Sequence, residues 1–125
     1  MGRKLLLLAL LFLTVLILTA TVFALDQKYG ITDRHEITFD QPAWVGDVLL
    51  PVGKYEVRHT MEGAEHVMHF RQLNVKRPAE ARVRCTPLWV PNRIAQTQIG
   101  FRQNAANELV LNRMAFKGDH AEHRF

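Results

Sequence analysis

The sequence predicts an all-β fold, a single antiparallel β-sandwich of about seven short strands. Two patterns predict this fold. Apolar and polar residues alternate with a period of two through most of the chain that follows an apolar N-terminal segment, which is typical of half-buried strands. Turn-forming residues recur at intervals of about ten residues, as they do in small sandwiches and barrels. A small closed β-barrel is therefore the alternative.

The expected strands follow one another without an internal repeat or a long linker. Ile37 and Phe39 alternate with polar neighbours in the first strand, which Pro42 ends. Gly100 and the nearby asparagines argue against a helix over residues 94–109. The other strands are expected over residues 44–50, 55–61, 66–73, 83–90, 94–102 and 109–116.

Turn signals separate these strands. Leu50 to Gly53 has proline at its second position and glycine at its fourth, the pattern of a type I turn. Glu62 to Glu65 encloses Gly-Ala and predicts a tight hairpin. Gln103 to Asn107 is a polar turn, and Lys76 to Ala81 is expected to be a basic loop.

Alternation also separates the core from the surface. Cys85 falls on the same face as Val83, so the thiol is expected to point inward. His120 and His123 follow the last expected strand and are interpreted as part of a surface tail. The predicted core consists of Phe39, Val57, Phe70, Val83, Ile99 and Leu111.

The N-terminal segment has the layout of a secretory signal peptide. Arg3 and Lys4 form a short basic start, Leu5 to Leu18 is uncharged and apolar, and small residues follow as far as Ala24. Cleavage after Ala24 would give a signal peptide over residues 1–24 and a β-sandwich domain over residues 25–125. We therefore expect a periplasmic or secreted protein.

The alternative for this segment is an uncleaved N-terminal membrane anchor. Leu5 to Leu25 contains 21 residues without a charge, and about 20 apolar residues can span a bilayer as a helix. Contact with a membrane is expected only through this leader. The lone Cys85 lies far from it, so no lipid-bearing cysteine follows the leader.

The charge of the chain does not indicate a nucleic-acid partner. The formal net charge is +4, and removal of the leader takes away Arg3 and Lys4 but no acid, which leaves +2. No nucleic-acid recognition motif is present. The basic residues between Arg71 and Arg84 are explained by a solvated strand face and a loop.

The two strands of the Glu62–Glu65 hairpin each carry a His-x-Met unit. A two-residue loop pairs Met61 with His66, and the next pair on the same face is His59 with Met68. Two imidazoles and two thioethers within reach of one ion form a soft ligand set that suits Cu(I). The sequence therefore predicts a candidate Cu(I) site made of His59, Met61, His66 and Met68.

The competing interpretation of this hairpin is core packing without a cofactor. Tyr55, Val57 and Phe70 lie on the same expected face, so both methionines could simply fill the core. A register shift of one residue would also place His59 and His66 on opposite faces and abolish the site.

Cys85 is the only cysteine, so it cannot form an intramolecular disulfide. A lone thiol in an oxidising compartment is buried, paired between chains or a metal ligand. Its place on an apolar face favours a buried and unreactive thiol.

No catalytic signature is present, so the protein is not expected to be an enzyme. No nucleophile elbow, a serine flanked by glycines, is present. Arg84 and Thr86 beside Cys85 match no cysteine-hydrolase signature. The first hypothesis is a non-catalytic exported binding or structural module of the bacterial cell envelope. It would act on an envelope protein or through self-association, for example by strand addition at a sheet edge. The alternative is a Cu(I)-binding or copper-delivery protein.

Residues 44–47, Trp-Val-Gly-Asp, and residues 49–55, Leu-Leu-Pro-Val-Gly-Lys-Tyr, follow the leader in the first half of the chain. Together they resemble a class of small exported bacterial β-domain proteins of unknown function. The hallmark of that class is a Val-Gly-x-x-Leu-Pro-x-Gly-x-Tyr hairpin. This chain departs from the hallmark in two ways: three residues, 47–49, separate Val-Gly from Leu-Pro, and Val52 replaces the alanine that is usual between the proline and the glycine. The resemblance implies export and a β fold, and it supplies no activity and no functional residues.

Overall fold

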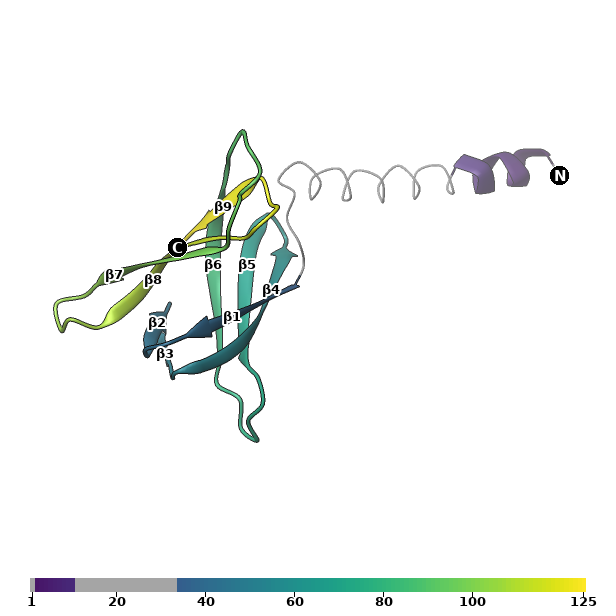
Figure 1. Ribbon diagram of the computed structural model, residues 1–125. Helices are drawn as coiled ribbons and strands as arrows, with labels where there is room; N and C mark the ends of the chain where they lie inside the picture. Colours follow the sequence, from purple (N-terminus) through teal and green to yellow (C-terminus); the bar gives the residue numbers. More distant parts are fainter. Residues whose placement is uncertain (1, 11–33) are drawn as a thin grey trace.

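The computed structural model describes residues 2–10 and residues 34–125 (Figure 1). Residues 2–10 form a short, exposed helix. The expected cleavage point after Ala24 and most of the leader lie outside the described residues. Within the described ranges, no helix is long and apolar enough to cross a bilayer.

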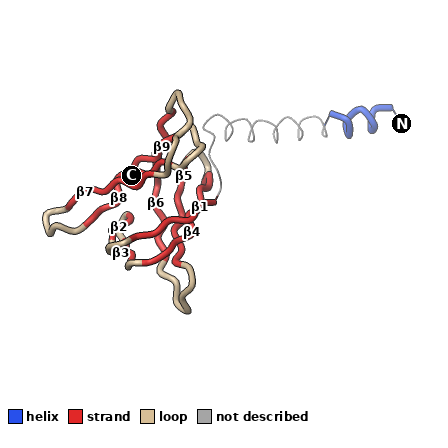
Figure 2. The backbone as a smooth tube through the Cα atoms, viewed as in Figure 1, coloured by secondary structure: helices blue, strands red, loops and turns tan. Residues whose placement is uncertain are grey.

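Residues 34–125 form strands joined by turns and loops, which confirms the all-β prediction (Figure 2). The strands are β1 (Arg34–Phe39), β2 (Ala43–Val45), β3 (Val48–Leu50), β4 (Gly53–Glu62), β5 (Glu65–Gln72), β6 (Glu80–Trp89), β7 (Gln98–Gln103), β8 (Leu109–Ala115) and β9 (Ala121–Arg124).

These strands form one hydrogen-bonded sheet in the order β1-β4-β5-β6-β9-β8-β2-β3, and β7 pairs with β8. The end strands β1 and β3 do not pair with each other in the described part of the chain, so the sheet is open and is not the closed barrel. β2 and β8 run parallel, which departs from the purely antiparallel prediction. Every other pair of described strands is antiparallel.

The structure has more strands than the predicted set of about seven because two segments differ from expectation. The predicted strand over residues 44–50 is a hairpin: Gly46 adopts φ 56° and reverses the chain between β2 and β3. Residues 121–124, predicted to be a surface tail, form β9 and insert between β6 and β8. The remaining predicted strands are present with shifted ends.

β6 carries the sheet from one half of the molecule to the other. Its first part, Glu80 to Cys85, pairs with β5, and its second part, Thr86 to Trp89, pairs with β9. Strand β6 therefore changes its pairing partner, from β5 to β9, directly after Cys85. The β2–β3 hairpin then packs beside β6, where a Cβ on Gly46 would lie in ordinary van der Waals contact with Val83, 3.5 Å from its Cγ2. The result is sandwich-like, because the open sheet folds its two halves around one core.

The core lies on the inner face of this folded sheet. Phe39, Val57, Phe70 and Leu111 are buried as predicted, while Val83 and Ile99 are partly buried and pack against the cluster. Tyr55 is also fully buried and donates a hydrogen bond of 2.7 Å to the carbonyl of Pro51, which ties the turn before β4 to the sheet.

Candidate metal centre

The β4–β5 hairpin has the register that the sequence predicts. Glu62 pairs with Glu65, Met61 with His66, and His59 with Met68. Directly opposite residues in antiparallel strands share a face. The predicted juxtaposition of the four histidine and methionine positions on one face is therefore confirmed, whereas their binding of a metal stays a prediction.

The four side chains do not share one environment. His59 is 6% exposed and Met68 is fully buried within the hydrophobic core, but Met61 is 41% exposed. His66 is half-buried, and its Nδ1 lies 3.0 Å from Nε2 of His59. The two imidazoles thus come together, while the two thioethers are separated: that of Met68 lies in the core and that of Met61 lies at the surface.

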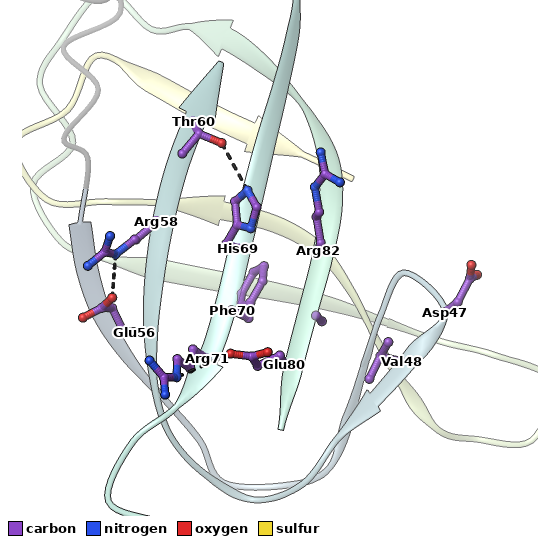
Figure 3. A pocket seen from close by; sticks show the side chains of 11 residues that line it. Asp47, Val48, Glu56, Arg58, Thr60, His69, Phe70, Arg71, Glu80 and Arg82 are labelled. Carbon is purple, nitrogen blue, oxygen red and sulfur yellow. Dashed lines mark hydrogen bonds and ion pairs between the residues drawn. The ribbon is translucent and has the colours of Figure 1, made fainter. Parts of the chain in front are cut away.

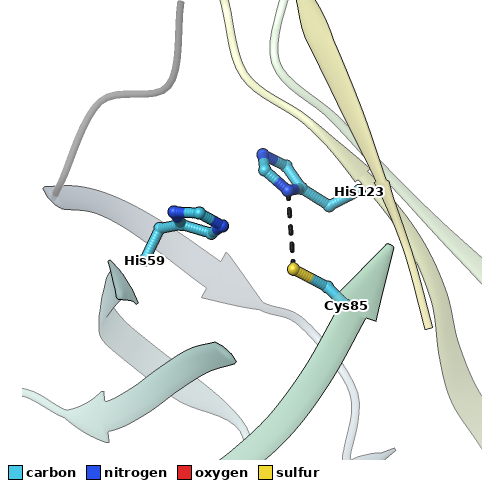
Figure 4. A group of neighbouring side chains, drawn as sticks. All are labelled: His59, Cys85 and His123. Carbon is cyan, nitrogen blue, oxygen red and sulfur yellow. Dashed lines mark hydrogen bonds between the residues drawn. The ribbon is translucent and has the colours of Figure 1, made fainter. Parts of the chain in front are cut away.

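Two further donors, from strands far along the chain, join His59. Cys85 lies on β6 directly opposite His66, and His123 lies on β9 directly opposite Pro87. One ligand atom each from His59, Cys85 and His123 lie within 4.8 Å of one another. Figure 4 shows the three side chains directed toward a common centre. Their strands are neighbours or near neighbours in the sheet, so its pairing holds the donors in place.

His123 is the residue that the sequence prediction misplaced. It is fully buried in β9, and the prediction of a surface tail is wrong for it. Its Nδ1 lies 3.6 Å from Sγ of Cys85, and its Nε2 is buried without a hydrogen-bond partner among the described residues. Burial, reinforced by the neighbouring histidines, lowers the pKa of His123 to about 3. The ring is therefore neutral at physiological pH, the form in which imidazole binds metals.

Cys85 is buried, as predicted, with an exposed fraction of 8%. Burial raises the pKa of its thiol to about 11, so the thiol stays protonated at neutral pH. Such a thiol is a weak nucleophile in the absence of a cation. A bound metal would displace the proton, because the thiolate is the ligand form.

The wall behind His123 is aromatic and contains a second histidine. Phe116 packs 5.9 Å from the His123 ring, centroid to centroid. His35 in turn stacks face to face on the ring of Phe116, with the two ring centroids 3.7 Å apart. Nε2 of His35 lies 3.8 Å from Oδ2 of the buried Asp119, and burial lowers the pKa of His35. The cluster is therefore shielded from water on this side.

The outer face of β4, β5 and β6 carries a cleft of about 800 Å³, which the β2–β3 turn borders (Figure 3). Its cations have acidic neighbours: Arg58 Nε lies 2.7 Å from Glu56, and Arg71 Nε lies 3.4 Å from Glu80. His69 lies opposite Arg58 in the register, and its Nε2 is 3.2 Å from Oγ1 of Thr60. Opposite charges are balanced along this surface, which gives it the character of a solvated strand face.

No known protein family, curated protein or solved structure matches this chain. The Val45-to-Tyr55 stretch of the resembling motif covers the end of β2, β3, the start of β4 and the turns between them. The resemblance itself stays a prediction.

Proposed function

We propose that this protein is a non-catalytic Cu(I)-binding protein of the cell envelope, which holds the ion with His59, Cys85 and His123. The observation that carries the proposal is the convergence of these three donors within 4.8 Å inside the fold. The Nδ1 of His123 adds to it, because this nitrogen already faces Sγ of Cys85 at 3.6 Å inside the fold. Compared with the hairpin site predicted from the sequence, this site keeps His59. Cys85 and His123 take the place of the other three predicted ligands.

The donor set favours copper over zinc for two reasons. One thiolate and two imidazoles form a soft, three-coordinate site, whereas zinc in structural sites is almost always four-coordinate. Charge is the second reason. Cu(I) with the Cys85 thiolate is neutral overall, but Zn(II) with one thiolate leaves a net positive charge in a buried place. Burying an uncompensated charge is expensive.

The burial of the donors supports binding without catalysis. His59, Cys85 and His123 are 6%, 8% and 0% exposed. Catalytic metal sites keep a position open for substrate or water, while closed sites hold the ion. A closed, neutral site is suited to storing or carrying Cu(I).

The test is a competition titration of the full-length protein against a chromophoric Cu(I) chelator under oxygen-free, reducing conditions. The wild type should remove one Cu(I) per chain from the chelator. Cys85→Ala should weaken binding by more than about 100-fold, beyond the range of 10–100-fold that is typical of changes outside the ligand shell. His123→Gln should weaken it by at least about tenfold.

The matched control is His69→Gln, which changes the same residue type on the outer face of β5 and should bind as the wild type does. Circular dichroism of each variant checks that the strands are retained. Wild-type affinity in Cys85→Ala and His123→Gln would refute the proposed site, as would a clear preference of the wild type for Zn(II).

The sequence-based hypothesis of a partner surface or of self-association also stays a proposal. Its support is the edge of β3, which ends the strand order and pairs only with β2 among the described strands. Val48 and Leu49 on that edge are 39% and 42% exposed, and Val52 after it is 53% exposed. An apolar edge of this kind can recruit another strand. Light scattering of the purified protein tests this, and a monomer at all concentrations would count against self-association.

A further inference from the structure

Three soft donors form a row across the inner face of β4, β5 and β6. Met61 is directly opposite His66 in the β4–β5 register. His66 is directly opposite Cys85 in the β5–β6 register. Opposite residues in antiparallel strands have Cβ atoms about 5 Å apart. Each donor in the row therefore lies within side-chain reach of the next.

Exposure falls along this row from the surface to the candidate metal centre. Met61 is 41% exposed, His66 is half-buried, and Cys85 is 8% exposed. His66 also meets the centre from a second direction, because its Nδ1 lies 3.0 Å from Nε2 of His59. The row thus joins solvent to two of the three proposed ligands.

We propose that Met61 and His66 are the uptake path by which Cu(I) reaches the centre formed by His59, Cys85 and His123. This inference rests on the proposed function. A closed site needs such a path because the ion has to shed its previous ligands before it enters a place that water does not reach. The thioether of Met61 and the imidazole of His66 are the soft donors that Cu(I) accepts.

Each step along the path is a ligand exchange without a change in oxidation state. A Cu(I)–sulfur bond to Met61 forms as the bond to the external donor breaks. A Cu(I)–nitrogen bond to His66 then replaces it, and a Cu(I)–sulfur bond to Cys85 replaces that in turn. The thiol proton of Cys85 leaves to solvent, so one proton is released for each ion bound.

The path predicts an effect on rate without an effect on affinity. Entry and exit use the same steps, so loss of the first donor slows both and leaves their ratio unchanged. For Met61→Leu, which keeps an apolar side chain but removes the sulfur, we expect the transfer rate to fall by about tenfold and Kd to stay within about twofold. Met61→His restores a soft donor and should recover most of the rate.

The experiment is stopped-flow transfer of Cu(I) from a chromophoric chelator to the full-length protein, beside the equilibrium titration of the same samples. Thr60→Val is the matched control, because Thr60 neighbours Met61 on β4 but faces the outer side of the sheet. This control should transfer at the wild-type rate.

The outcomes separate the uptake path from the proposed function. A wild type that binds no Cu(I) refutes both. A Met61→Leu protein that binds Cu(I) at the wild-type rate refutes the path alone and means that the ion enters elsewhere. A Met61→Leu protein with weakened Kd also overturns the path, because Met61 would then be a resident ligand, as the hairpin site predicted from the sequence requires.

Discussion

The two faces of β4, β5 and β6 carry the same residue type in opposite surroundings. His66 and His69 lie three residues apart on β5 and therefore point to opposite sides of the sheet. On the outer side, Nε2 of His69 lies 3.4 Å from a carboxylate oxygen of Glu62, among exposed ion pairs. On the inner side, His66 meets the imidazole of His59 at 3.0 Å and lies opposite the buried thiol of Cys85.

The inner face is the better place for a soft cation. Outer-face arginines and glutamates neutralise one another, so this surface is stable in water without a ligand. On the inner face, burial keeps Cys85 and His123 uncharged, because it raises the pKa of the thiol and lowers the pKa of the imidazole. Neutral imidazole and thiolate are the forms in which these side chains bind metal ions. Substitutions on the two faces should therefore differ in their effects.

The largest expected effect is on stability, at neighbouring residues of β5. Phe70 is 1% exposed on the inner face, and Phe70→Ala should lower the free energy of unfolding by about 3–5 kcal/mol, because it leaves a cavity. Arg71 is next to it on the outer face with a side chain that is 65% exposed. Arg71→Ala should cost less than about 1 kcal/mol, because exposed ion pairs contribute little.

Urea unfolding of both variants and the wild type measures this difference. Salt offers a second check, because it should change the small effect of Arg71→Ala and leave that of Phe70→Ala nearly unaltered. Equal costs at the two positions would mean that the two faces are not distinguished as described.

The next effect is expected from acid, through His123. Its pKa is about 3 in the folded protein and about 6.5 in an unfolded chain. Between these values the unfolded chain binds a proton that the folded protein does not. The free energy of unfolding of the metal-free protein should therefore fall as the pH drops below about 6.5. The total loss should be a few kcal/mol near pH 3, since one pKa unit corresponds to about 1.4 kcal/mol.

His123→Gln removes this titration, so its stability should decline less steeply than that of the wild type between pH 7 and pH 4. Part of the decline should persist, because burial also lowers the pKa of His35. Denaturant unfolding at several pH values in the presence of a chelator gives both slopes. Identical slopes would show that His123 is not held neutral by the fold.

The parts of the site that the sequence predicted are those set by local pairing. The Gly63-Ala64 loop and the alternation on either side of it are enough to fix the register of His59 with Met68 and of Met61 with His66. The same local rules predicted the burial of Phe39 and Phe70. β4 and β5 are consecutive in the chain and adjacent in the sheet, so nothing beyond the hairpin was needed.

The rest of the site depends on pairing between distant segments. Cys85 and His123 are 38 positions apart, and they meet because β9 inserts between β6 and β8. Local alternation cannot say which distant strand β6 will pair with. A signal was nevertheless present in the tail. Ala121, His123 and Phe125 alternate with the charged Glu122 and Arg124, a period of two that is typical of a half-buried strand.

X-ray absorption spectroscopy of the Cu(I)-loaded full-length protein identifies the ligands of the ion directly. A centre made of His59, Cys85 and His123 predicts one sulfur and two nitrogens around copper, and the sulfur should disappear in Cys85→Ala. Two sulfurs that persist in Cys85→Ala would contradict it. They would assign the ion to Met61 and Met68 of the hairpin, as the sequence alone predicts.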